Sequence, residues 1–323
     1  MYRLRPLLLI LVALNFLSCG NGTEKVSPPM QLIFWYGLGV AAVDWIAPWQ
    51  VTTQRPLLQL KIGGPNPGGL DVIDALSAGE NGVLGLMGWN DESKSSLAFI
   101  FHPTDRRVER ITATVGYSYT MAMMPGNRGI VFLSNSSGYP MGSVAEAELS
   151  KVRMDIVVYD LAKHRSLRFA SGEASVATQV SITPDGQTIT FDAVDGWIKS
   201  VNLSTGEVTK LLEGYAPAWS PEGTRLAYRR GRSLFVYEVA TKTSRRLYTR
   251  YPWQPDFITH LRGVLHWSPD GRYLAVNVHS YSLFPLRPEL EECVVIEAET
   301  GKASSVSVGE DSAWCGPWVR NVS

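Results

Sequence analysis

The residues able to do acid–base or metal chemistry in this chain are few and scattered. No two histidines have the i, i+4 spacing that sets zinc ligands on one helix face, and no C-x-x-C pair or Gly-x-Ser-x-Gly nucleophile motif occurs. His260 and His266 lie nearest to a pair, and we expect them to supply loop and strand polarity rather than a metal site. The sequence therefore predicts no catalytic residue, no metal ligand and no cofactor. The five histidines are His102, His164, His260, His266 and His279.

Three acidic residues occur at the same position of a repeated tripeptide, a pattern that could also indicate a ring of carboxylates. Each follows a proline and precedes a glycine, at Asp185, Glu222 and Asp270. Proline fixes φ, aspartate bonds back to its own backbone and glycine accepts positive φ, so this tripeptide is typical of a tight turn. We interpret the three acids as turn formers and not as a catalytic set.

One cysteine carries a chemistry of its own near the start of the chain. Arg3 and Arg5 precede an apolar run from Leu7 to Leu14, and Phe16-Leu17-Ser18-Cys19-Gly20 follows. This resembles a bacterial lipobox, with Phe16 where leucine is usual. The resemblance implies a signal peptide over residues 1–18, acylation of Cys19 and a polar tether over residues 19–30. An ordinary cleaved signal peptide is the alternative.

The other two cysteines are Cys293 and Cys315. In an oxidising compartment they would form one structural disulfide between the last repeats. The alternative is two small buried apolar side chains that never meet, because spacing alone does not give the distance between their Cα atoms.

Aromatic side chains in long connections are the best candidates for recognition. Tyr251 and Trp253 lie in one such connection, and Tyr281 and Phe284 lie in another. Aromatic groups in loops suit binding of a protein or a glycan. The aromatic cluster near the start of the chain (Phe34-Trp35-Tyr36, Trp45 and Trp49) is expected to pack between sheets instead.

Composition limits the class of partner. The chain has 30 basic and 30 acidic residues, a formal net charge of zero, 45% hydrophobic and 19% charged residues. These values are typical of a packed globular protein. They lack the excess of basic residues that is typical of a nucleic-acid-binding protein. We expect no nucleic-acid partner.

A repeated sequence motif predicts the strands that position these residues. Alternating strands follow Pro184-Asp185-Gly186, Pro221-Glu222-Gly223 and Pro269-Asp270-Gly271, and each copy continues into two further strands. Four antiparallel strands in a repeat of this length are the blade of a β-propeller. The repeats are clearest over residues 175–310, where strands are predicted at Val176–Thr183, Thr188–Phe191 and Ser233–Val239. A further strand is predicted at Pro56–Ile62, near the start of the chain. We predict an all-β fold, with one propeller over residues 31–323 and six four-stranded blades; five or seven blades are the alternatives. Three strands from the start and one from the end would share the closing blade.

The repeated motif occurs as Ala218-Trp219-Ser220-Pro221-Glu222-Gly223 and as His266-Trp267-Ser268-Pro269-Asp270-Gly271. These two segments resemble the WD-repeat-like propeller motif of TolB-type proteins. The resemblance implies a non-enzymatic, lipid-anchored scaffold in the bacterial cell envelope that binds another envelope protein. Gly20 after the acylated cysteine implies the outer membrane. The alternatives are a lactonase- or glycosidase-like propeller enzyme with its site in the central channel, and a glycan-binding module. The predicted inner strands are mostly apolar or small, with His266 as the main exception, which favours the scaffold.

Overall fold

Each repeated phrase folds as a hairpin whose turn is held by its own side chains. In the first copy, Ile182 pairs with Ile189, and the N–H of Gly186 donates to the carbonyl of Thr183 at 2.7 Å. Asp185 Oδ1 accepts from the Thr183 hydroxyl at 2.6 Å and from the N–H of Gln187 at 3.0 Å. Gly186 has a φ of 70°, which explains the glycine. Asp185 is therefore a turn former, as the sequence predicts.

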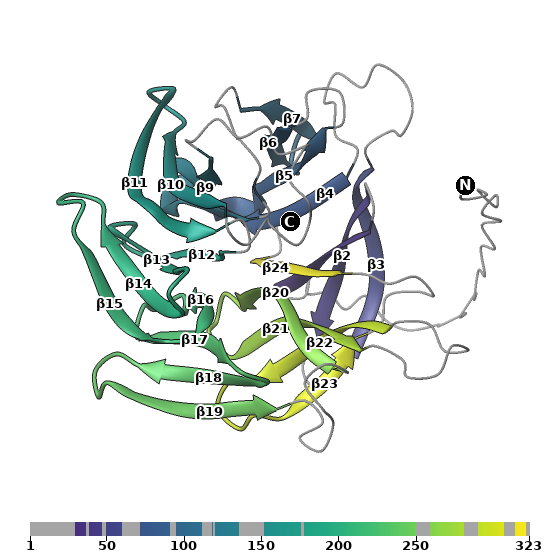
Figure 1. Cartoon of the computed structure of the whole chain (residues 1–323). Coiled ribbons are helices and arrows are strands. Elements are labelled where there is room, and N and C mark those ends of the chain that lie inside the picture. The colour runs from purple at the N-terminus through teal and green to yellow at the C-terminus, as the bar shows by residue number, and fades with distance from the viewer. Residues whose placement is uncertain are drawn as a thin grey trace, which may run out of the picture.

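A computed structural model describes residues 30–36, 39–46, 50–59, 72–90, 95–111, 118, 120–135, 152–175, 178–249, 259–280, 290–306 and 314–320. Within them the strands form six four-stranded antiparallel sheets around a central axis (Figure 1). In five of these sheets the four strands are consecutive in the chain. Their bounds are β4 (Val72–Ala78), β5 (Leu84–Asn90), β6 (Ser95–His102) and β7 (Arg107–Arg110); β8 (Met121–Met123), β9 (Gly129–Ser134), β10 (Arg153–Asp160) and β11 (Arg165–Ser175); β12 (Val180–Ile182), β13 (Thr188–Asp192), β14 (Trp197–Asn202) and β15 (Val208–Glu213); β16 (Tyr215–Trp219), β17 (Arg225–Arg230), β18 (Ser233–Glu238) and β19 (Thr243–Thr249); and β20 (Thr259–Trp267), β21 (Tyr273–Ser280), β22 (Leu290–Glu297) and β23 (Ala303–Val306). The prediction of an all-β propeller is confirmed.

The remaining sheet joins the two ends of the described chain. Its order is β24-β1-β2-β3, with bounds β1 (Met30–Tyr36), β2 (Gly39–Ile46), β3 (Gln50–Gln59) and β24 (Trp314–Arg320). β1 lies between β2 and β24, and its pairing with β24 runs from Met30 opposite Arg320 to Trp35 opposite Trp314. Three N-terminal strands and one C-terminal strand thus share a sheet, in the arrangement that the sequence predicts.

Two inner hairpins lack the Pro-Asp-Gly turn and use a short 3₁₀ turn in its place. These turns are η1 (Glu80–Gly82), between β4 and β5, and η2 (Pro125–Asn127), between β8 and β9. Asn81 and Gly126 take positive φ inside them. The same chain reversal is therefore made with different residues, which explains why the sequence signature fades towards the first repeats.

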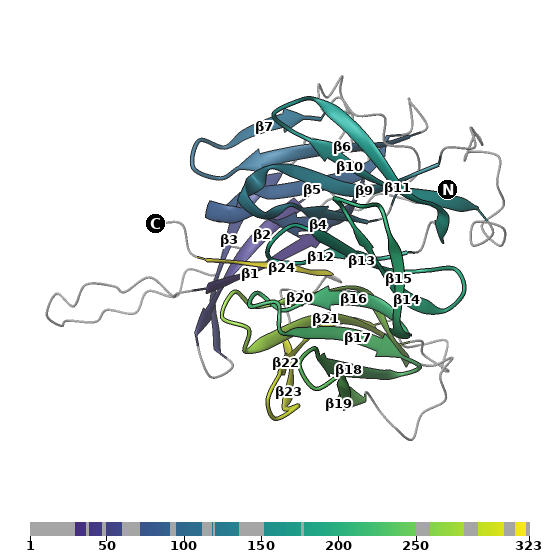
Figure 2. The same ribbon diagram turned by 90° about the vertical axis from the view of Figure 1, so that its left-hand side faces the viewer.

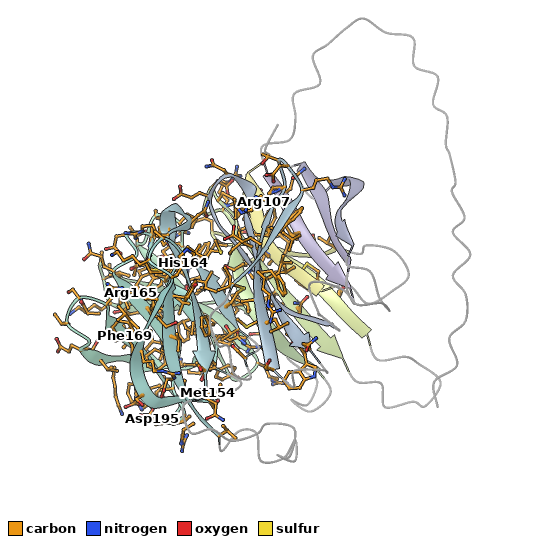
Figure 3. All side chains as sticks on the ribbon, turned by 90° about the horizontal axis from the view of Figure 1, so that it is seen from above. Arg107, Met154, His164, Arg165, Phe169 and Asp195 are labelled. Carbon is orange, nitrogen blue, oxygen red and sulfur yellow. A yellow bond between two sulfur atoms is a disulfide. The ribbon has the colours of Figure 1, made fainter. Side chains whose placement is uncertain are left out.

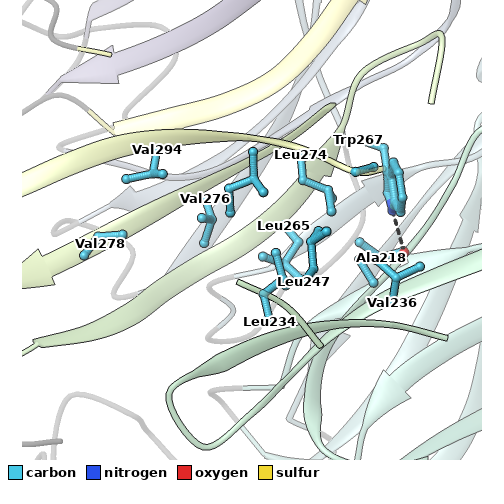
Figure 4. Close-up of a cluster of buried hydrophobic side chains, with 13 residues drawn as sticks. Ala218, Leu234, Val236, Leu247, Leu265, Trp267, Leu274, Val276, Val278 and Val294 are labelled. Atoms are coloured by element: carbon cyan, nitrogen blue, oxygen red, sulfur yellow. Dashed lines mark hydrogen bonds between the residues drawn. The ribbon is translucent and has the colours of Figure 1, made fainter. Parts of the chain in front are cut away.

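The core consists of apolar layers between neighbouring sheets. One layer packs the β8–β11 sheet against the β12–β15 sheet, and another packs the β16–β19 sheet against the β20–β23 sheet. In the second layer, Leu274 and Val276 of β21 face Leu234 and Val236 of β18 (Figure 4). The indole N–H of Trp267 donates to the carbonyl of Ala218 at 2.9 Å and ties the two inner strands together (Figure 4).

The strand directions give the molecule two unlike faces. The turns after the inner strands, and those between the third and fourth strands, lie on one face, here called the tight-turn face. In the side view, the β6–β7 turn and the end of β24 both lie on its side, at the left (Figure 2). Arg107 in that β6–β7 region and Asp195 in the β13–β14 turn lie toward opposite ends of the view in Figure 3. The face with the β13–β14 turn is here called the long-connection face, because the segments 136–151, 250–258 and 281–289 attach to strand ends there.

Candidate functional site

The inner strands surround a cavity of about 360 Å³ at the centre of the ring. Every one of the six sheets contributes to its lining through β4, β8, β12, β16, β20 or β24. Apolar side chains predominate, among them Met121, Val180, Leu265 and Trp318. The apolar character that the sequence predicts for the inner strands is therefore present along the described wall.

Equivalent positions of the inner strands carry Ser77, Ala122, Ser181, Ala218 and His266, and all five line the cavity. The two serines connect neighbouring sheets. Ser77 Oγ accepts the N–H of Met123 at 2.9 Å, and Ser181 Oγ accepts the N–H of Trp219 at 3.0 Å. A polar side chain at this level can thus satisfy a backbone donor of the next sheet, which is a structural role.

His266 is the one large polar side chain at this level. Its residue is 9% exposed, and burial lowers the pKa of the imidazole from 6.5 to about 3, so the ring is neutral at physiological pH. Among the described residues, none forms a hydrogen bond with its buried Nε2. An unsatisfied buried polar atom is uncommon in a folded protein and points to strain or to a missing partner.

The mouth of the cavity opens on the tight-turn face and is rigid. Four turn prolines line it, namely Pro125, Pro184, Pro221 and Pro269. Glu80 takes the corresponding place in the first repeat, where its Oε1 accepts the N–H of Gly126 at 2.7 Å. Arg225 donates to the carbonyl of Gly271 at 2.8 Å across the boundary between the β16–β19 and β20–β23 sheets. Contacts between neighbouring turns therefore fix the rim.

The described lining contains one imidazole, His266, and one carboxylate, Glu80. Within the described ranges, no group of three or more His, Cys, Asp or Glu side chains is placed to hold a metal ion. The structure separates the two histidines that the sequence singles out. His266 lines the cavity near the tight-turn face, whereas the backbone of His260 pairs with that of His279 at the start of β20.

Two buried carboxyl groups lie outside the cavity and were not singled out by the sequence. Burial raises the pKa of Asp192 from 3.8 to about 6, although its side chain accepts the N–H groups of Gln179 at 2.8 Å and Ala216 at 3.3 Å. Burial likewise raises the pKa of Asp74 to about 6. Asp192 bridges the β12–β15 and β16–β19 sheets, so its role is architectural.

The closing strand β24 is fixed to the neighbouring sheet by two devices. Cys293 in β22 and Cys315 in β24 form a disulfide, with their Cα atoms 5.4 Å apart. Asn277 in β21 is 3% exposed, and its Oδ1 accepts the N–H of Cys315 at 2.8 Å while its Nδ2 donates to the Cys315 carbonyl at 3.3 Å. The sequence singles out the cysteines but not Asn277. The signal was a polar residue within the apolar run Tyr273–Val278.

The remaining predicted site residues lie outside the described residues. They are the lipidation candidate Cys19 and the recognition candidates Tyr251, Trp253, Tyr281 and Phe284. The ends of the strands that flank these recognition segments are described, and they meet. Thr259 pairs with Ser280, and Ser280 pairs with Leu290, on the long-connection face. In the described part of the chain, no helix has the length and apolar character needed to cross a membrane.

No family model and no curated protein matches the chain. Solved structures do match it in fold. TolB from Acinetobacter baumannii aligns with a TM-score of 0.63 and 13% identity, over 90% of this chain and 67% of that one. A putative TolB from Agrobacterium tumefaciens gives 0.55 and 12%, over 91% and 98% of the two chains. A chain of a nidogen–laminin complex gives 0.60 and 9%, over 90% and 97%. The chain is therefore a β-propeller that resembles TolB and the nidogen propeller in fold.

Proposed function

We propose that this protein is a non-enzymatic scaffold of the bacterial cell envelope that binds another envelope protein through its long-connection face. The observation that carries the proposal is the meeting of strand ends at Thr259, Ser280 and Leu290. Segments 250–258 and 281–289 both attach to these strand ends, and we infer that their aromatic residues bind the partner on this side of the ring. Clustered aromatic groups are typical of the centre of a protein interface.

One comparison supports a binding role. The nidogen propeller was solved in a complex with laminin, and TolB has the same fold. Identities near 10% carry the fold and not the partner. They make a propeller that binds protein a reasonable class for this chain, and leave the partner to experiment.

The central cavity suits catalysis less well than binding. Glu80 uses Oε1 to hold the N–H of Gly126, and His266 is neutral at physiological pH. Hydrolysis by acid–base catalysis uses at least two groups that exchange protons near the operating pH. We therefore infer a protein without enzymatic activity.

We also infer that the β24-β1-β2-β3 sheet is a sixth blade that closes the ring. Its hydrogen-bonded order and its contacts with the β20–β23 sheet support this count. β1 begins at Met30 on the tight-turn face. If Cys19 carries lipid, residues 20–29 can span at most about 35 Å. The tight-turn face would then lie towards the membrane, here proposed to be the outer membrane, and the long-connection face would point away from it.

A crosslinking experiment tests the partner site. The lipidated protein is crosslinked in cells and recovered, and its neighbours are identified by mass spectrometry, for the wild type, Trp253→Ala, Tyr281→Ala and Leu167→Ala. Leu167 is 49% exposed on the outer strand β11 and serves as the matched control. We expect one neighbour to be lost with Trp253→Ala and Tyr281→Ala and retained with Leu167→Ala. Identical neighbours in all four samples would overturn the proposed surface.

Two further measurements test the lipid anchor and the alternative glycan-binding function. Cys19→Ala should release the protein from the membrane fraction, and unchanged membrane association would contradict the lipid anchor. Binding of peptidoglycan or polysaccharide that is lost with Trp253→Ala would favour the glycan-binding module over the protein scaffold.

A further inference from the structure

The position of His266 in the ring distinguishes it from its equivalents. Ser77 and Ser181 each accept a backbone N–H of the next sheet at this level, at 2.9 Å and 3.0 Å. His266 occupies the equivalent place in β20, lines the same cavity and is 9% exposed, yet its Nε2 has no hydrogen-bond partner in the described part of the chain. The inter-sheet bond that explains the two serines therefore does not account for this imidazole nitrogen.

The surroundings of His266 restrict what could supply the missing partner. Trp267 and Leu265 flank it in β20, and Pro317 and Trp318 of β24 line the cavity with it. The cavity volume of about 360 Å³ lies in the lower range of small-molecule sites. An anion would lose its hydration among these apolar groups without meeting a cation in the described lining, and the one carboxylate there, Glu80, already accepts the N–H of Gly126. An uncharged molecule avoids this cost.

We propose that the central cavity binds an uncharged, mainly apolar small molecule whose hydroxyl group forms a hydrogen bond with His266, the imidazole turning so that its enclosed Nε2 faces the cavity. A hydroxyl group fits either tautomer of the neutral imidazole, because it can donate a proton or accept one. The apolar body of the ligand replaces water against the surrounding side chains. The rim formed by the turn prolines places the entrance on the tight-turn face, on the other side of the ring from the proposed protein-binding surface.

The test uses phenol and toluene as a matched pair of probes that differ in the hydroxyl group. The protein carries ¹⁵N-labelled histidine, and long-range ¹H–¹⁵N spectra follow the ring nitrogens during titration. The His266 resonances are assigned by their loss in His266→Phe. We expect phenol to shift the His266 Nε2 resonance in a saturable manner and to bind about tenfold more tightly than toluene.

The variants show whether the preference arises at this nitrogen. His266→Phe keeps an aromatic ring but no hydrogen-bonding atom. This variant should therefore bind phenol and toluene with about equal affinity. His102→Phe removes a histidine that lies in β6 away from the cavity, and it should keep the wild-type preference. If His266→Phe does not fold, the relative affinity of the wild type for phenol and toluene still tests the proposal. No saturable shift of the His266 nitrogens, or an equal affinity for the two probes, would overturn the proposal.

Discussion

Asp192 and His266 show how burial sets the protonation state of single residues in this propeller. Burial raises the pKa of Asp192 to about 6 and lowers the pKa of His266 to about 3. Both shifts favour the neutral form, because a charge is poorly solvated between the sheets. The two residues therefore make the free energy of unfolding depend on pH with opposite signs.

Asp192 should stabilise the protein more at low pH. Its folded pKa of about 6 exceeds the ordinary value of 3.8, so the folded state binds the proton more tightly, and this stability is lost as the pH rises through about 6. Asp192→Asn keeps an oxygen for the two N–H donors and does not titrate. From pH 5 to pH 7, we expect the stability of the variant relative to wild type to rise by about 1 kcal/mol in urea unfolding. Asp185→Asn is the control, because the pKa of this exposed turn residue is lowered and it titrates below that window.

His266 should have the opposite effect. Its folded pKa of about 3 lies below the ordinary value of 6.5, so the unfolded state binds the proton more tightly, and stability is lost as the pH falls below about 6.5. His266→Phe removes this loss. The stability of the variant relative to wild type should be greater at pH 5 than at pH 7 by about 2 kcal/mol. A difference that does not change with pH would show that the folded pKa of His266 stays near 6.5.

At the scale of elements, the strand β24 depends on a side chain of its neighbour. Asn277 satisfies both the N–H and the carbonyl of Cys315, and all three groups are buried. Backbone groups left unpaired inside a protein cost free energy because water cannot replace the lost partner. Asn277 therefore stabilises the position of β24 together with the disulfide.

Asn277→Ala should lower the free energy of unfolding by about 3 kcal/mol, since two buried backbone groups lose their partner at once. Asn202→Ala is the matched control. Asn202 Oδ1 accepts the N–H groups of Ser204 and Thr205 in an exposed turn, where water can take its place. The control should lose about 1 kcal/mol or less. Equal losses in the two variants would mean that Asn277 does not hold β24.

The strands could be predicted from the sequence where alternation and turn chemistry agree. The segment Thr188–Phe191 becomes β13 (Thr188–Asp192), and the predicted strand Ser233–Val239 becomes β18 (Ser233–Glu238). β3 begins at Gln50, earlier than the predicted start at Pro56, because its pairing with β2 extends to Gln50 opposite Ile46. The first inner strand of the clear repeats is shorter than predicted, at Val180–Ile182. Pairing with a neighbour decides these ends, and periodicity does not reveal it.

The candidate site could be predicted only in its general character. Apolar inner strands and the exception at His266 are visible in the sequence. The surroundings of His266 include Pro317 and Trp318 of β24, which line the same cavity, and that arrangement joins residues distant in sequence. The same holds for Asn277, whose partner Cys315 belongs to another sheet. Contacts between sheets therefore decide the surroundings of His266 and Asn277, and the repeats alone do not predict them.

At the scale of the whole molecule, the two ends of the described chain lie side by side. Met30 pairs with Arg320 in the β1–β24 ladder, so the closing sheet depends on contacts between its strands and not on an unbroken chain through it. A sheet closed in this way leaves β1 without a free edge. The chain should then still fold when its termini are joined and new termini are placed in an exposed turn.

A circular permutant tests this closure. A short Gly-Ser linker joins Arg320 to Met30, and the chain is opened between Thr205 and Gly206 in the exposed β14–β15 turn. Opening there removes one backbone hydrogen bond, from the N–H of Gly206 to the carbonyl of Asn202. We expect cooperative unfolding with a free energy within about 2 kcal/mol of linear residues 30–320, because exposed turns tolerate new termini. A second permutant, opened between Val276 and Asn277 inside the buried strand β21, should not fold. If the turn-opened permutant also fails, pairing of β1 with β24 is insufficient to close the ring.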